Sequence, residues 1–70
     1  MKYLVLVEKS SSGFGATAPD LPGCTASGYT LDETLELMHG SIEMHLELMR
    51  EQGMPVPEPS VISIHQVEAA

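Results

Sequence analysis

The sequence predicts a single α+β domain over residues 1–70, with the element order strand, strand, strand, helix, strand. Three observations predict this class. The stretch 30–53 carries helical spacing and helix-end signals at both ends. Short β-prone segments separated by turn residues precede that stretch, and another follows it. Seventy residues are enough for one small domain, whose core is marginal without further support.

The helix is marked by its ends and by its apolar spacing. Thr30 and Glu33 form a capping box, Gly53 is placed to end the helix in a left-handed conformation, and Pro55 prevents its continuation. Residues three and four apart lie on one face of a helix. Six apolar residues follow that spacing and are expected to cover the sheet: Leu31, Leu35, Met38, Ile42, Leu46 and Met49.

A second set of side chains lies on the remaining surface of this helix. Leu37, Met44 and Leu48 form an outer apolar line opposite the first stripe. Beside it runs an acidic row made of Glu36, Glu43, Glu47 and Glu51. Charge runs are usually solvated, so a plain hydrophilic face is one interpretation. The other is a docking surface for a basic partner, formed by the acidic row and the outer apolar line together.

The other segments predict a four-stranded mixed sheet. Strands are expected at residues 2–8, 14–18, 24–27 and 61–67, with a rigid connector at 19–23 and an extended proline-rich path at 54–59. The first strand is apolar on both faces, which is typical of a central strand. The helix is a crossover, so the last strand is expected to return parallel to the first.

One helix covers only one face of such a sheet. Either Leu4 and Leu6, or Tyr3, Val5 and Val7, are then left facing outward. We expect this second face or the open strand edges to pack against another copy of the chain, giving a dimer or tetramer. Tyr3, Val5 and Val7 are the predicted oligomer interface.

Composition excludes several classes of protein. The net charge is −7 and Lys and Arg total 3, too few to hold a phosphate backbone, so no direct nucleic-acid binding is expected. The single cysteine and the absence of a signal-like start indicate a cytoplasmic location. No apolar run is long enough to span a membrane.

The run Pro19-Asp20-Leu21-Pro22-Gly23-Cys24, the capped helix behind it and the closing run 54–59 resemble the HicB antitoxin family over nearly the whole chain. The resemblance implies a partial RNase H-like domain of the same element order. It implies a HicA-like toxin as partner, a small basic mRNA-cleaving ribonuclease that the domain masks, and homo-oligomers. Many members continue into a DNA-binding segment. This chain stops after its last predicted strand, so a stand-alone toxin-binding domain is expected.

The alternative is an orphan homo-oligomeric domain of the same fold, which binds another protein or a small ligand without catalysis. Electrostatics favours the toxin, because a ribonuclease surface that attracts phosphate is basic and an acidic inhibitor competes for it.

No catalytic residue, metal site or cofactor is predicted. A metal nuclease needs several clustered carboxylates, whereas Glu8 and Asp20 stand alone. Asp20 is expected to cap its own connector, and Cys24 to be a buried small residue. The three histidines lack the same-face spacing of helical metal sites and are expected at the surface: His39, His45 and His65.

Overall fold

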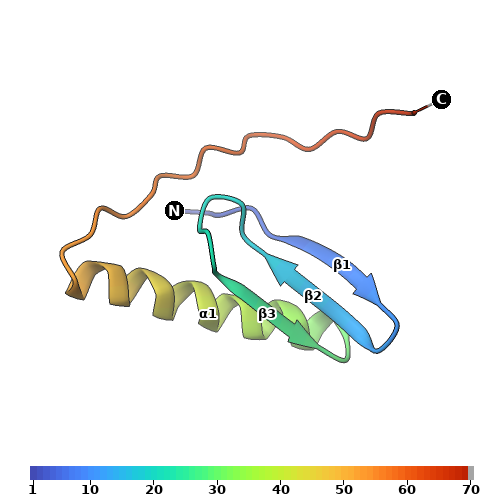
Figure 1. Cartoon of the computed structure of the whole chain (residues 1–70), viewed down its shortest axis with the longest axis horizontal. Coiled ribbons are helices and arrows are strands. Elements are labelled where there is room, and N and C mark those ends of the chain that lie inside the picture. Colours follow the sequence, from blue (N-terminus) through green and yellow to red (C-terminus); the bar gives the residue numbers. More distant parts are fainter. Residues whose placement is uncertain (70) are drawn as a thin grey trace.

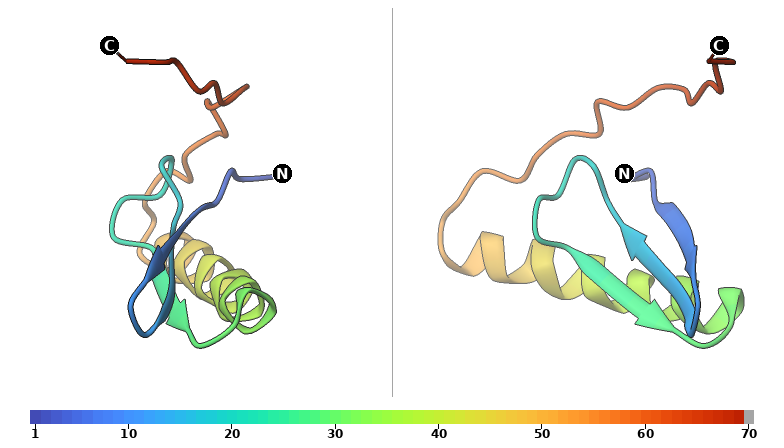
Figure 2. Two further views of the ribbon diagram at one scale, coloured as in Figure 1. Left: turned by 90° about the vertical axis from the view of Figure 1, so that its right-hand side faces the viewer. Right: turned by 45° about the vertical axis from the view of Figure 1, so that its right-hand side comes forward.

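The structure, a computed structural model, describes residues 1–69 and contains three strands and one helix. Strand β1 is Leu6–Ser10, β2 is Gly13–Thr17, β3 is Thr25–Gly28 and α1 is Leu31–Glu51. The strands form an antiparallel sheet in the order β1-β2-β3. The helix lies along one face of this sheet, packed over β2 and β3 (Figures 1 and 2).

The turns of the meander follow from local chemistry. Ser10 pairs with Gly13, so a two-residue loop joins β1 to β2. The β2–β3 connector is held by two backbone hydrogen bonds, from the Leu21 amide to the Ala18 carbonyl and from the Cys24 amide to the Leu21 carbonyl, both 3.0 Å. These bonds turn the Leu21 side chain inward, where it is only 1% exposed.

Both predicted ends of α1 are confirmed. The Thr30 hydroxyl accepts a hydrogen bond from the Glu33 amide at 3.1 Å, and the Glu33 carboxylate accepts from the Tyr29 amide at 3.4 Å. The predicted capping box is therefore present, with the returning bond made one residue earlier than expected. At the other end Gly53 has φ +69°, and the Met54 amide donates to the Met49 carbonyl at 2.9 Å, which ends the helix in a Schellman-type turn.

The core lies between α1 and the sheet. Its buried members come from β2, the β2–β3 connector and α1: Ala16, Ala18, Leu21, Cys24 and Met38, together with Thr34. Thr34 is completely buried, and its hydroxyl donates to the Thr30 carbonyl at 2.7 Å, which satisfies a polar group that sequence patterning did not place in the core. The face of α1 that meets the sheet is consequently rotated from the predicted stripe, since Leu31 and Leu35 stay more than 40% exposed.

The predicted fourth strand, residues 61–67, is not formed in the described structure, and the sheet is antiparallel rather than mixed. Residues 54–69 contain neither helix nor strand. After α1 the chain runs back extended past the β2–β3 connector, and its C-terminal part stands clear of the sheet and helix in every view (Figures 1 and 2). The prolines at 55, 57 and 59 lack amide donors, and two side-chain contacts to the domain, described below, fix the path.

Without that strand, β1 is an edge strand rather than the central one that the sequence predicted. Along β1 only β2 is hydrogen-bonded to it in the described sheet. The two faces of β1 differ in burial. Val7 packs against the core on the helix side, whereas Leu6 points to the other face and is 40% exposed.

Candidate protein-docking surface on the helix

The acidic row lies on the side of α1 that faces solvent. Glu36, Glu43, Glu47 and Glu51 are all exposed. One of them is paired locally, because the His39 ring nitrogen lies 3.0 Å from the Glu43 carboxylate, and both side chains are more than 60% exposed. Over its whole length α1 carries six carboxylates and one arginine, Arg50. This side of the helix is therefore strongly negative.

The outer apolar line is exposed as well. Leu37 is 49% exposed, Met44 67% and Leu48 50%. Each of these side chains offers apolar surface next to the carboxylates, an arrangement that suits a binding face with an apolar anchor and a charged border. The structure thus brings the seven predicted partner-binding residues together on one accessible side of α1, and their binding role stays a prediction.

Leu48 also belongs to a pocket of about 300 Å³ near the end of α1. His45 and Met49 line it from the helix, Leu21 from the connector and Pro57 from the C-terminal segment. The returning chain therefore forms one border of the outer apolar line. This pocket was not predicted, because it joins residues that are far apart in the sequence.

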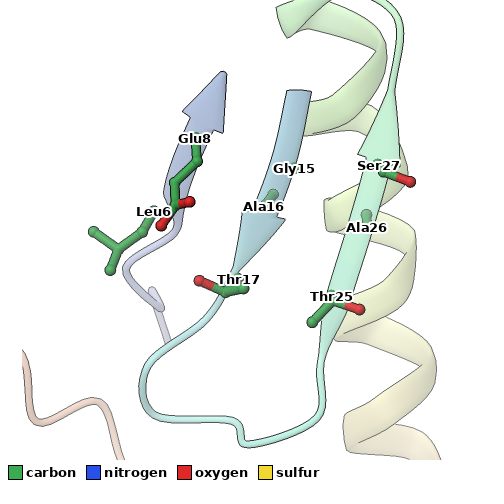
Figure 3. A pocket seen from close by; sticks show the side chains of 8 residues that line it. All are labelled: Leu6, Glu8, Gly15, Ala16, Thr17, Thr25, Ala26 and Ser27. Carbon is green, nitrogen blue, oxygen red and sulfur yellow. The ribbon is translucent and has the colours of Figure 1, made fainter. Parts of the chain in front are cut away.

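The open face of the sheet forms a second hollow, of about 520 Å³, which the sequence did not single out (Figure 3). Figure 3 shows Leu6, Glu8, Thr17 and Thr25 on the near side of the sheet, with α1 behind it. Apart from Leu6 this lining is small or polar, in contrast to the apolar interface expected for an outward face. The alternating Thr, Gly and Ser residues of β2 and β3 could have indicated from the sequence that this face of the sheet is polar.

The predicted oligomer-interface residues lie on the other side. Tyr3, Val5 and Val7 are half-buried and pack against the core under the sheet. Of the two alternatives left open by the sequence, the structure therefore turns Leu6 outward. Tyr3 and Val5 still border a groove of about 490 Å³ between the N-terminal segment and α1, and contact with a second chain there stays a prediction.

The Asp20 carboxylate bonds to the C-terminal segment rather than capping its own connector as predicted. Its carboxylate accepts hydrogen bonds from the Ser60 amide at 3.0 Å, from the Ser60 hydroxyl and from the Val61 amide at 3.3 Å. Hydrogen bonds from the Ser60 hydroxyl and amide lower the pKa of Asp20 below its usual value, desolvation opposes them, and the bond from the Val61 amide adds to the lowering. No sequence signal links two segments 40 residues apart.

A second contact holds the same segment. The Tyr3 hydroxyl donates a hydrogen bond to the Pro57 carbonyl. Together, Asp20 and Tyr3 fasten residues 57–61 to the connector and to the N-terminal segment.

The three histidines do not converge. His39 pairs with Glu43, His45 is half-buried beside Leu21, and the His65 ring nitrogen lies 2.9 Å from the Ser63 hydroxyl. Within residues 1–69 there is no cluster of three or more metal-ligating side chains. Cys24 is 2% exposed, with its sulfur 3.6 Å from the Ser41 hydroxyl, which places it in the core as expected.

Within the described residues, α1 is the one helix, and it is not apolar enough to cross a bilayer.

Known proteins resemble this chain in sequence. A protein described as an uncharacterized 14.9 kDa protein of Haemophilus phage HP1 is 34% identical over 62 residues, which cover 89% of this chain and 47% of the phage protein. The chain thus spans about half the length of that relative. The UPF0150 protein ssr1765 of Synechocystis is 34% identical over 61 residues, covering 86% of this chain and 77% of that protein.

Structural comparison points the same way. A chain of the HicA3 and HicB3 toxin-antitoxin complex matches with a TM-score of 0.73 and 27% identity, over 84% of this chain and 70% of that one. The family model described as HicB_like antitoxin of bacterial toxin-antitoxin system matches residues 3–70. The chain therefore belongs to the HicB-like antitoxin family of bacterial toxin–antitoxin systems.

Proposed function

We propose that this chain neutralises a small basic HicA-type ribonuclease toxin by binding it and covering its working surface. The observation that carries the proposal is the match, over most of the chain, to a structure solved as a HicA3–HicB3 complex. The proposed action is binding alone, with no catalytic step by this chain.

The charge of the protein supports this partner. The chain has 10 acidic residues against 3 Lys and Arg, and six of the acidic residues lie on α1. A ribonuclease presents positive potential to its RNA substrate, so the acidic row competes with phosphate for the same surface. Complementary charge also accelerates association, which matters for an inhibitor that has to intercept a toxin before it reaches mRNA.

The outer apolar line would supply the apolar contacts that a stable complex needs in addition to charge. Rim charges in water contribute modestly to affinity, whereas buried apolar anchors carry most of the binding free energy. Leu37, Met44 and Leu48 are exposed beside the acidic row and are our proposed anchors. Docking of the toxin on this side would cover them and leave the sheet face free.

A cytoplasmic location follows from the proposed target, because an mRNA-cleaving toxin acts where translation takes place. The experiment is co-expression with the product of the reading frame next to this chain's own, which we expect to be a small basic protein. We expect that protein to arrest growth alone, to be harmless together with this chain, and to co-purify with it. Unrelieved growth arrest together with no co-purification would contradict the proposal.

A further inference from the structure

The C-terminal residues beyond the Asp20 contact form a β-prone segment that its own domain does not use. Ile62 is 95% exposed, Ile64 58% and Val67 87%. The described hydrogen bonds of the chain past Val61 are confined to the local pair of Ser63 and His65. Three exposed β-branched side chains in an extended strand-length segment are unfavourable in water, so this segment is expected to be covered by another surface.

The sheet has a vacant position of matching size. β1 pairs with β2 along one side and leaves the other edge open over Leu6–Ser10. Five residues of strand span about 17 Å, and an added strand of similar length supplies the missing hydrogen bonds of such an edge. Residues 61–67 are long enough to fill it.

The region next to that edge is an uncovered apolar groove. It has a volume of about 490 Å³ and lies between the N-terminal segment and the flank of α1. Tyr3 and Val5 line it from one side, and Leu35, Ile42 and Leu46 from the other. In the described structure its lining ends at Arg50, so the chain's own C-terminal segment does not close it.

The side-chain pattern of the segment fits this groove. Residues alternate across a strand, which puts Ile62 and Ile64 on one face and Ser63 and His65 on the other. A strand paired with β1 would turn the two isoleucines toward the helix side, where Val5 and Val7 already pack. Ser63 and His65 would then continue the polar open face formed by Glu8 and Thr17.

The contacts at the base of the segment fix where it leaves its own domain. Asp20 holds Ser60 and Val61 at the β2–β3 connector, and Tyr3 holds Pro57. Pro57 and Pro59 favour a stiff extended path that resists folding back. The segment therefore leaves its own domain already extended, as Figures 1 and 2 show.

We propose that two copies of this chain exchange these segments, so that residues 61–67 of each copy pair with β1 of the other and cover its groove with Ile62 and Ile64. Exchange of identical elements gives a closed two-fold dimer at little cost, because each copy gains the contacts it provides. The exchange gives each domain the fourth strand that the sequence predicted. It does not depend on the proposed toxin, and of the acidic row of α1 only Glu43 lines the covered groove.

Analytical ultracentrifugation of the full chain and of the I62D/I64D variant tests the exchange. We expect a dimer for the natural chain and a dissociation constant at least about a hundredfold larger for the variant, since two buried isoleucines are replaced by charges. The matched control is S63D/H65D, which adds charge to the opposite face of the same segment and is expected to keep the dimer. Circular dichroism verifies that α1 persists in both variants.

NMR on a dimer of mixed labelled and unlabelled copies tells which chain provides the strand. Contacts between residues 61–67 of one copy and β1 of the other are expected. A monomeric full chain, contacts to β1 only within one copy, pairing of the two C-terminal segments with each other, or a dimer unchanged by I62D/I64D would each overturn the proposal.

Discussion

Asp20 and Ser60 are joined across 40 residues of sequence, with the carboxylate of one accepting both the backbone amide and the hydroxyl of the other. This contact ties the β2–β3 connector to the chain that returns from α1. It sets the point at which the C-terminal residues leave the domain.

Replacing Asp20 by Asn is expected to loosen the C-terminal segment without unfolding the domain. The amide keeps one acceptor oxygen but loses the charge that strengthens its hydrogen bonds to Ser60 and Val61. Hydrogen exchange at the Ser60 and Val61 amides is the measurement, and we expect faster exchange there with unchanged protection in α1. Asp32→Asn is the control, since Asp32 is exposed in the first turn of the helix, and it is expected to leave exchange at residues 60 and 61 unaltered.

The same contact predicts a pH dependence. Hydrogen bonds from Ser60 lower the pKa of Asp20 in the folded chain. A group with a depressed folded pKa contributes stability that is complete above its unfolded pKa, about 3.9 for Asp, and is lost as the pH falls through the folded value. We therefore expect the amide shifts of Ser60 and Val61 to stay native through the ordinary titration range of Asp and to change only in stronger acid. A change centred at or above the unfolded pKa would contradict this.

Two glycine substitutions are expected to change stability in opposite directions. A Cβ at Gly28 would lie 2.8 Å from the Thr34 hydroxyl, which is buried and already bonded to the Thr30 carbonyl. Gly28→Ala is therefore expected to destabilise the fold by about 1–3 kcal/mol. Gly40 lies in the middle of α1 with open space around its Cβ position, so Gly40→Ala is expected to stabilise by about 0.5–1 kcal/mol. Urea denaturation measures both, and equal effects of the two would show that crowding at Thr34 is not responsible.

Local signals predicted the helix well. Thr30, Glu33 and Gly53 act through hydrogen bonds and backbone angles within a few residues of themselves, so their roles could be predicted from the sequence. The exposed positions of Leu37, Met44 and Leu48 followed from the same periodicity. The burial of Thr34 was not predicted. Its hydroxyl donates a hydrogen bond within the helix, which lets a polar residue occupy the core.

The last strand could not be predicted in the same way. A β-prone pattern at 61–67 indicates that the segment can form a strand, but it does not indicate which edge of a sheet the segment can reach. That depends on Asp20 and Tyr3, whose contacts with the segment join residues 40 and 54 positions apart. The central position predicted for β1 required residues 61–67 to pair with its second edge. Since they do not pair there within the chain, β1 is an edge strand.

The docking surface on α1 is tested by affinity. The probe is a catalytically inactive form of the toxin expected from the neighbouring reading frame, titrated by isothermal calorimetry. Glu43, Glu47 and Glu51 changed together to Lys form the test variant; Glu8, Glu58 and Glu68 changed together to Lys form a control with the same net charge. All six are exposed, so neither variant removes a buried contact. Thermal denaturation verifies that both remain folded.

We predict that the natural chain binds this probe, that reversing the three helix charges weakens binding at least about a hundredfold, and that the control binds within about tenfold of the natural chain. Equal affinity of the two variants would contradict a toxin-binding role for the acidic row of α1.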